Sequence, residues 1–166
     1  MKIHTVKKGE TVAGSISAGQ KRDALLRKIL CGMGAYEAVT YSFISPKWYD
    51  ALLLKENDAL RMSAKLMNPL GEDFSIMRTT SMNGMLTSLA FNYNHRNKNV
   101  RLYELANVYL PKSLPLTELP EERMMFTLGM YGECDFFTMK GVIEEFFEMA
   151  GMNEKMTCSP KAGKPF

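Results

Sequence analysis

The sequence predicts an α+β domain in which a mainly antiparallel sheet is flanked by helices. Amphipathic helical segments alternate with short segments rich in β-branched and aromatic residues. Hairpin-like gaps separate several of the predicted strands, which favours antiparallel pairing. At 166 residues, the chain is long enough for one domain with a substantial buried core.

The first predicted helix begins near Ser17. Ser17 and Gln20 have the spacing of a capping box, in which two side chains bond backbone N–H groups that the helix leaves free. Gly32 or Gly34 is expected to end this helix. Its apolar face is formed by Leu25, Leu26, Ile29, Leu30 and Met33.

The remaining elements are predicted from hydrophobic periodicity and from residues that start or end helices and strands. Proline at its favoured first position predicts a short helix over residues 46–52. Strict i, i+3, i+4, i+7 spacing of Met and Leu residues predicts an amphipathic helix over 82–93, and a last helix is expected over 139–150. Strands are expected over residues 37–44, 61–67, 75–78, 100–109 and 123–131.

Composition excludes several classes of protein. The net charge of +3 is too small to indicate nucleic-acid binding by itself. The three cysteines are widely spaced and predict reduced thiols in a cytosolic protein rather than a disulfide framework or a zinc site. No segment is apolar enough to predict a membrane span, and the first residues do not open a signal peptide. No metal site is expected, because neither histidine has a partner at ligand spacing.

Arg78 and Glu104 are the polar residues whose positions need explaining. Arg78 ends a short predicted strand that leads into a helix. Glu104 lies on the same face of its predicted strand as the apolar residues. A carboxylate on a buried face needs a partner, and Arg78 is a candidate. The pair either clamps a substrate or braces the fold from inside. We favour the structural brace, because no acid, base or metal ligand accompanies it.

A basic segment connects the helix at 82–93 to the strand at 100–109. It contains Arg96, Lys98 and Arg101, and Tyr93 lies just before it. These residues are candidates for contacts with RNA phosphates. The favoured alternative is a solvated turn.

Five blocks of sequence, taken in order, resemble one known family. They are KIHTVKKGETVAGSISAGQ, GAYEAVTYSFISP, LMNPLGEDFSIMRTTSMNGMLTSLAFNYNHRNKNVRLYELANVYLP, LPEERMMFTLGMYG and DFFTMKG. Together they resemble the β subunit of bacterial phenylalanyl-tRNA synthetase. The resemblance implies the tail of a B5-like domain at residues 1–15 and an incomplete class II aminoacyl-tRNA synthetase-like core at 16–166. We therefore expect the chain to be a piece of a longer polypeptide, truncated at its C-terminus.

In that family the α subunit is catalytic, and it uses ATP and Mg²⁺ to charge tRNA(Phe) in a cytoplasmic α₂β₂ enzyme. The resemblance implies that this β module packs with the α subunit and needs no cofactor of its own. Active class II cores carry a phosphate-gripping arginine where this chain has Leu110, and the glutamate two residues beyond it is also missing. We therefore expect no catalytic residue.

The resemblance also suggests a subunit interface. The helix at 17–33 occupies the place of the first class II motif, which commonly lies between subunits. Two other functions stay open: a free-standing synthetase paralogue that binds an amino acid or adenylate, and a tRNA-binding module. The interface candidates are Leu25, Leu26, Ile29 and Met33.

Overall fold

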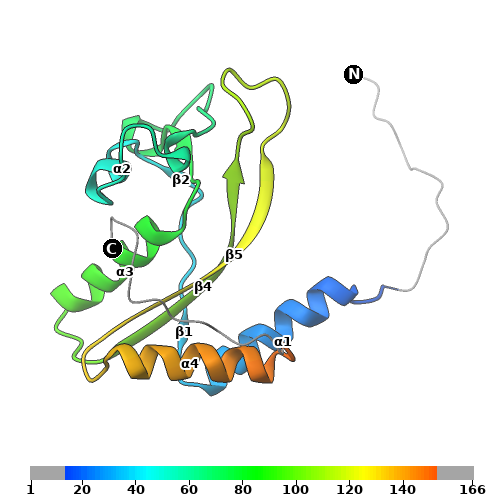
Figure 1. Ribbon diagram of the computed structural model, residues 1–166, viewed down its shortest axis with the longest axis vertical. Coiled ribbons are helices and arrows are strands. Elements are labelled where there is room, and N and C mark those ends of the chain that lie inside the picture. Colours follow the sequence, from blue (N-terminus) through cyan, green and yellow to red (C-terminus); the bar gives the residue numbers. More distant parts are fainter. Residues whose placement is uncertain (1–13, 153–166) are drawn as a thin grey trace, which may run out of the picture.

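A long antiparallel hairpin forms the centre of the computed structural model, which describes residues 14–152 (Figure 1). Its strands β4 (Val100–Leu110) and β5 (Glu121–Tyr131) pair along their whole length, from Val100 opposite Tyr131 to Leu110 opposite Glu121. The short strand β1 (Tyr36–Glu37) joins the other edge of β4 in the parallel direction. The expected α+β class is therefore confirmed, and the main sheet is mixed, with one long antiparallel pair and one short parallel pair.

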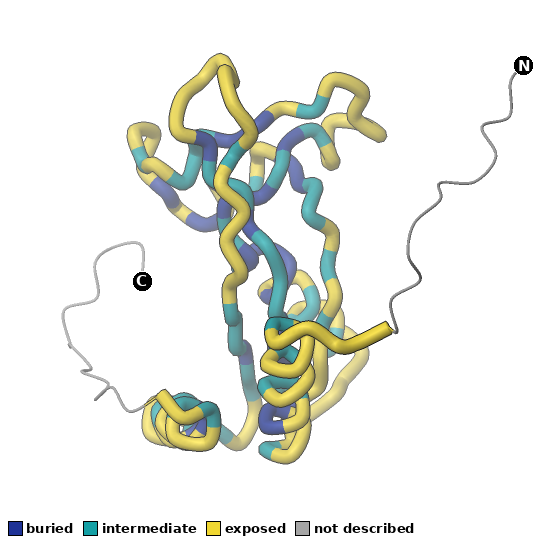
Figure 2. Tube along the Cα trace, turned by 90° about the vertical axis from the view of Figure 1, so that its right-hand side faces the viewer, coloured by how far each residue is buried: buried dark blue, intermediate teal, exposed yellow. Residues whose placement is uncertain are grey.

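Helices cover both faces of this sheet because residues of β4 alternate between them. Tyr103 and Leu105 face α1 (Ala18–Gly32) and α4 (Phe136–Met149), in a core cluster that includes Leu30 and Phe146. The helix α3 (Met82–Asn94) packs against β4 and β5. Figure 2 shows how burial concentrates along these contacts, whereas most of the loop between β4 and β5 is exposed.

A second, smaller core surrounds a two-stranded antiparallel sheet. Its strands are β2 (Phe43–Ile44) and β3 (Ile76–Met77). The helix α2 (Lys47–Ala51) lies beside them, and two 3-10 turns, η1 (Ala59–Arg61) and η2 (Glu72–Phe74), complete the elements. The buried apolar residues of this cluster are Ile44, Tyr49, Leu52, Leu54 and Ile76.

Hydrogen-bonding side chains and a glycine cap the ends of α1 and α4. Ser17 Oγ accepts the N–H of Gln20 at 3.2 Å, and Gln20 Oε1 accepts the N–H of Ser17 at 2.9 Å, so the predicted capping box is confirmed. Gly34 follows α1 with a φ of 78°, in the left-handed region that glycine tolerates best. Asp135 and Thr138 form a second capping box at the start of α4.

The strand predicted over residues 37–44 is wrong as a single element. Only its two ends are strands, and Thr40 lies in a connecting segment between the two sheets. The backbone N–H of Thr40 donates to the Glu104 carboxylate at 3.0 Å instead of to a neighbouring strand. β-branched residues predict extended backbone here, but a buried carboxylate determines the bonding partner.

The strand predicted over 61–67 is also wrong. Its first residue ends η1, and only an isolated bridge from Lys65 to Ile76 has the pairing of a strand. Nearby, Ala64 accepts the N–H of Met77, so the segment passes beside β3 without a continuous ladder. In α3 the predicted apolar face is only partly right, because Asn83, Gly84 and Met85 are buried while Leu86 and Tyr93 are exposed.

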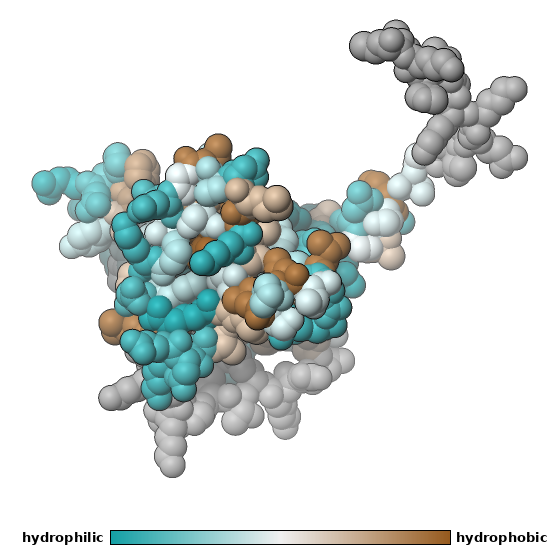
Figure 3. Space-filling view, turned by 90° about the horizontal axis from the view of Figure 1, so that it is seen from above, coloured by the Kyte–Doolittle hydropathy of each residue, from teal (hydrophilic) through white to brown (hydrophobic). Residues whose placement is uncertain are grey.

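Two expectations fall at the ends of the chain. The expected tail domain at 1–15 lies almost entirely outside the described residues, as does Cys158. Cys31 and Cys134 are free thiols within the described part. No helix in residues 14–152 is long and apolar enough to cross a membrane. The end of the molecule that carries the β4–β5 loop shows apolar side chains scattered among polar ones (Figure 3).

The cap of α4 gives a testable pH dependence. Hydrogen bonds from the Thr138 backbone and side chain lower the pKa of Asp135. A lowered folded-state pKa adds stability above the ordinary carboxyl pKa, and this contribution is lost as the pH falls through the folded pKa. We therefore expect Asp135→Asn to lose less stability than the wild type between pH 6 and pH 3. Urea midpoints at both pH values measure this, and equal losses would contradict it.

Candidate functional site

Arg78 lies where the small sheet meets the large one. It directly follows β3, and its backbone N–H donates to Ser42 O at 2.9 Å. Its carbonyl accepts the N–H of Tyr109 in β4, also at 2.9 Å. The backbone of Arg78 therefore joins the connecting segment 38–42 to the central hairpin.

The side chain of Arg78 forms an ion pair inside the protein. Its Nη1 lies 3.2 Å from Glu104 Oε1, and each side chain is only 2% exposed. The Nε donates to the carbonyl oxygen of Asn107 at 2.9 Å. Burying a charge is costly unless it is paired and hydrogen-bonded, and this arrangement supplies both.

Thr40 completes the network. Its hydroxyl accepts from Arg78 Nη1 at 3.0 Å and donates to Glu104 Oε1 at 2.9 Å. Thr40 reaches this position because Gly84 of α3 leaves room: a Cβ on Gly84 would lie 2.2 Å from the Thr40 hydroxyl oxygen. The network thus depends on four separate segments of the chain: the connecting segment, the end of β3, β4 and α3.

This arrangement is unsuited to gripping a substrate. The Arg78 side chain is almost completely buried, and its Nε and Nη1 already donate to protein oxygens. Glu104 Oε2 is buried without a hydrogen-bond partner among the described residues, so the carboxylate is held through Oε1 alone. Residues 14–152 contain no group of three His, Cys, Asp or Glu side chains arranged to hold a metal ion.

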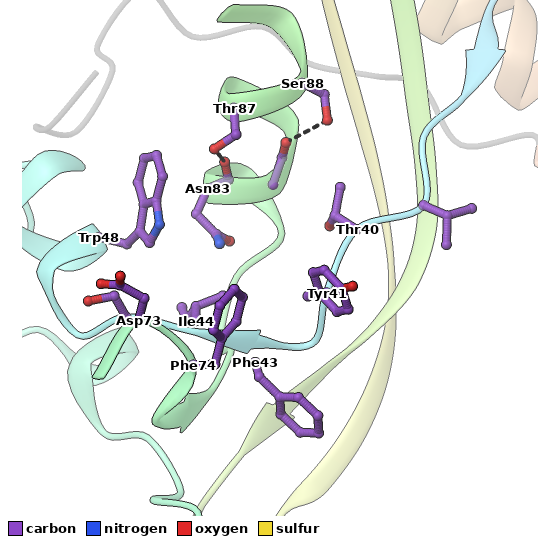
Figure 4. Close-up of a pocket in the computed structure, with 13 residues that line it drawn as sticks. Thr40, Tyr41, Phe43, Ile44, Trp48, Asp73, Phe74, Asn83, Thr87 and Ser88 are labelled. Carbon is purple, nitrogen blue, oxygen red and sulfur yellow. Dashed lines mark hydrogen bonds between the residues drawn. The ribbon is translucent and has the colours of Figure 1, made fainter. Parts of the chain in front are cut away.

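A cavity of about 440 Å³ lies beside the network, with Thr40 on its wall (Figure 4). Aromatic residues from the connecting segment, β2, α2 and η2 line it: Tyr41, Phe43, Trp48 and Phe74. From α3, Asn83 contributes an amide that is 5% exposed and whose Oδ1 has no partner among the described residues. Sequence periodicity missed this cavity because it assigned the buried side of α3 to Met and Leu residues.

The four interface candidates have different environments. Leu25 is 50% exposed, whereas Ile29 is 6% exposed and belongs to the core between α1, α4 and the sheet. Leu26 and Met33 are partly buried against the same core. Ile29 is therefore a core residue of this chain, because the helical face that meets the sheet includes it, and Leu25 is the candidate that stays exposed.

Titratable groups tie α1 to the sheet. Arg27 Nε donates to Glu37 Oε1 at 2.8 Å, and this hydrogen bond raises the pKa of Arg27. Burial raises the pKa of Tyr103, and the hydrogen bond between its hydroxyl and the Cys31 thiol, 3.5 Å apart, adds to this effect. The contacts of Arg27 with Glu37 and of Cys31 with Tyr103 therefore link α1 to the sheet.

The three basic candidates for RNA contact also lie in different environments. Arg96 and Lys98 are exposed in the turn between α3 and β4. Arg101 lies in β4, and its Nη1 donates to Met33 O at 2.7 Å, which anchors the end of α1. Arg101 thus has a structural partner, and only Arg96 and Lys98 remain together at the surface.

The architecture is that of an aminoacyl-tRNA synthetase of class II. Two solved structures of pyrrolysyl-tRNA synthetase from Desulfitobacterium hafniense are similar to it, with TM-scores of 0.67 and 0.62. Each is 18% identical in sequence, and the similarity covers 82% of this chain and 48% of the other. At this identity the likeness establishes the fold alone.

Sequence comparison is more specific. Residues 4–166 match the model of the phenylalanyl-tRNA synthetase beta chain CLM domain. The phenylalanine–tRNA ligase beta subunit of Clostridium acetobutylicum is 43% identical over 150 residues, covering 90% of this chain and 19% of the relative. That of Clostridium tetani is 44% identical over 121 residues, covering 73% and 15%. The chain belongs to the phenylalanyl-tRNA synthetase beta chain family and spans about a fifth of the length of such relatives.

The contact between Gly84 and Thr40 yields a prediction. Gly84→Ala should destabilise the protein by at least about 1 kcal/mol, because overpacking pushes Thr40 away from Glu104. The matched control is Gly141→Ala in α4, where a Cβ meets nothing within 4 Å. This control should stabilise by about 0.5–1 kcal/mol, since alanine favours a helix. Urea denaturation measures both, and stabilisation by Gly84→Ala would refute the packing argument.

Proposed function

We propose that this chain is a non-catalytic module of a phenylalanine–tRNA ligase beta subunit and that its function is assembly. In the proposal it packs with the catalytic α subunit in an α₂β₂ enzyme that charges tRNA(Phe) with phenylalanine. The observation that carries it is the buried network around Arg78. This arginine was the candidate for holding a substrate, and its side chain is bonded to groups inside the protein instead. Family membership supplies the context.

The end of β4 supports the absence of catalysis. Leu110 is the last residue of β4 and pairs with Glu121 of β5. A leucine side chain has no hydrogen-bond donor and no charge, so it cannot stabilise negative charge on a phosphate. We therefore assign ATP and Mg²⁺ to the catalytic partner and no cofactor to this module.

The proposal also includes the boundaries and the setting of the module. Residues 16–166 form the class II-like core and residues 1–15 the tail of a preceding domain. We place the enzyme in the cytoplasm, where its tRNA substrate is charged. Within the core, Arg78 and Glu104 act as a brace that holds the small sheet against β4.

Contact with the α subunit is assigned to the exposed side of α1. Leu25 exposes half of its apolar surface there, while the neighbouring core residues hold the helix in place. An exposed leucine on a helix whose C-terminal half is held in the core is well suited to a protein interface, because little order is lost when a partner covers it.

The brace can be tested with Arg78→Ala. Removing one partner of a buried ion pair leaves an uncompensated charge, so we expect a loss of about 3–5 kcal/mol of folding free energy. Aminoacylation per assembled α₂β₂ enzyme, measured well below the melting temperature, should stay close to that of the wild type. Denaturant unfolding and tRNA charging provide the two measurements.

Two variants control for the brace. Glu104→Gln keeps an acceptor for Thr40 and should cost less than Arg78→Ala. In the double variant Arg78→Ala with Glu104→Gln, the two losses should not add, because the residues act as one unit. Selective loss of turnover in Arg78→Ala, with an unchanged melting temperature, would overturn the structural role.

The interface can be tested with Leu25→Asp. We expect the variant chain to fold normally but to recover at least about tenfold less α subunit on co-purification, because a carboxylate replaces an exposed apolar contact. Leu119→Asp, in the exposed β4–β5 loop, is the matched control and should assemble normally. Ile29→Asp should instead unfold the chain itself. Normal assembly of Leu25→Asp would exclude this face of α1.

A further inference from the structure

The turn between α3 and β4 borders a second hollow, of about 780 Å³. Two tyrosines, Tyr93 and Tyr131, stand on its wall with their ring centroids 5.8 Å apart in an edge-to-face arrangement. Arg96 and Lys98 line the same hollow. Aromatic rings and cations therefore meet in one place that the assembly function leaves unused.

The two cations are free to bind an anion. Neither Arg96 nor Lys98 forms an ion pair with any residue in the described range 14–152. The segment 93–101 contains no acidic residue. The first acidic residue after β5 is Glu133, which directly follows Gly132 of the hollow. The C-terminal end of α3 also lies nearby. Because positive charge is favoured at a helix C-terminus, the alternative explanation of the basic turn is that it stabilises α3 rather than binding a ligand.

The backbone of Arg96 argues for a role beyond that alternative. Its φ is 60°, in the left-handed region where glycine or asparagine is preferred. A long side chain at such a position costs on the order of 1 kcal/mol. A lysine or arginine elsewhere in the last turn of α3 would satisfy the helix without this cost. The position of Arg96 places its side chain beside Tyr93 and Lys98.

The turn is held rigidly against the end of β5. The Tyr131 hydroxyl donates to Asn97 O at 2.9 Å, and Asn99 Oδ1 accepts the N–H of Glu133 at 2.9 Å. Gly132 permits this approach, since a Cβ there would lie 2.4 Å from Lys98 O. The backbone of the turn and the Tyr131 ring are therefore pre-organised, which lowers the entropic cost of binding a ligand.

We propose that this hollow binds an unpaired nucleotide of an RNA strand. Its phosphate contacts Arg96 and Lys98, and its base stacks on Tyr93, whose side chain is 70% exposed. Stacking on an aromatic ring combined with backbone cations is the general mode of single-strand recognition. That the RNA is a tRNA rests on the proposed function; the chemistry of the hollow requires only an unpaired nucleotide.

The test measures binding of the full chain to a short labelled single-stranded RNA by fluorescence anisotropy. The double variant Arg96→Ala with Lys98→Ala should reduce the slope of log affinity against log salt by about 0.7, because the two cations together neutralise one phosphate of the single strand. Tyr93→Ala should weaken binding on the order of tenfold, whereas Tyr93→Phe should bind as the wild type does. Glu133→Gln should strengthen binding slightly, because it removes a negative charge from the residue that follows Gly132 of the hollow.

The matched control removes the same charge elsewhere. Lys47→Ala with Lys65→Ala, at two exposed positions near the small sheet, should leave the salt slope and the affinity nearly unchanged. Equal losses in both double variants, or an unchanged affinity in Tyr93→Ala, would overturn the proposal. Equal binding of duplex RNA or of anionic lipid vesicles would also overturn it, because neither offers an unpaired base.

The assembled enzyme separates this proposal from the proposed function. The double variant at Arg96 and Lys98 should still co-purify with the α subunit, since these residues lie in the turn at the far end of α3 from Arg78. Its affinity for tRNA(Phe) should fall on the order of tenfold at low salt. Normal assembly with unchanged tRNA affinity would refute the RNA contact and leave the assembly function standing. Failure to assemble with any α subunit would refute the assembly function alone.

Discussion

The buried contact between Arg78 and Glu104 constrains the rest of the structure. Two charges removed from water must be paired and hydrogen-bonded, so the segments that supply their partners have to converge on one point. Thr40 comes from the connecting segment, Arg78 from the end of β3 and Glu104 from the middle of β4. This convergence fixes the small sheet against the large one. It also explains why the chain leaves the sheet after β1, because the Thr40 N–H is bonded to a carboxylate.

The same constraint separates structure from binding. An arginine that is 2% exposed and bonded to protein oxygens holds the fold, whereas the accessible chemistry lies at other places. One is the aromatic cavity beside Thr40, and another is the basic hollow at the far end of α3. Both lie along α3, which packs on the sheet between them. A rigid helix supported by β4 and β5 thus positions two surfaces without contributing a reactive group of its own.

Sequence periodicity predicted the elements whose residues have one consistent environment. Both strands of the hairpin were recovered to within two residues, because each is a long segment that contains β-branched and aromatic residues. The capping box at Ser17 was also identified, since capping depends on neighbours only three residues apart. The predictions failed at 37–44 and 61–67, where tertiary partners override local preference. In α3 the predicted apolar face omitted Gly84, which is buried because Thr40 needs its missing Cβ.

The sequence by itself determined the fold class, the family and the residue types that had to find partners. A carboxylate in the apolar phase of β4 already required a cation, and Arg78 was the available one. Only the tertiary structure decided that Arg101 is bonded to the end of α1, whereas Arg96 and Lys98 lie beside two tyrosines and form no ion pair within residues 14–152. Likewise, Ile29 and Leu25 share one helix, but contact with Tyr103 and Phe146 makes only Ile29 a core residue. The physical reason is that burial and pairing depend on segments distant in sequence, which local periodicity does not encode.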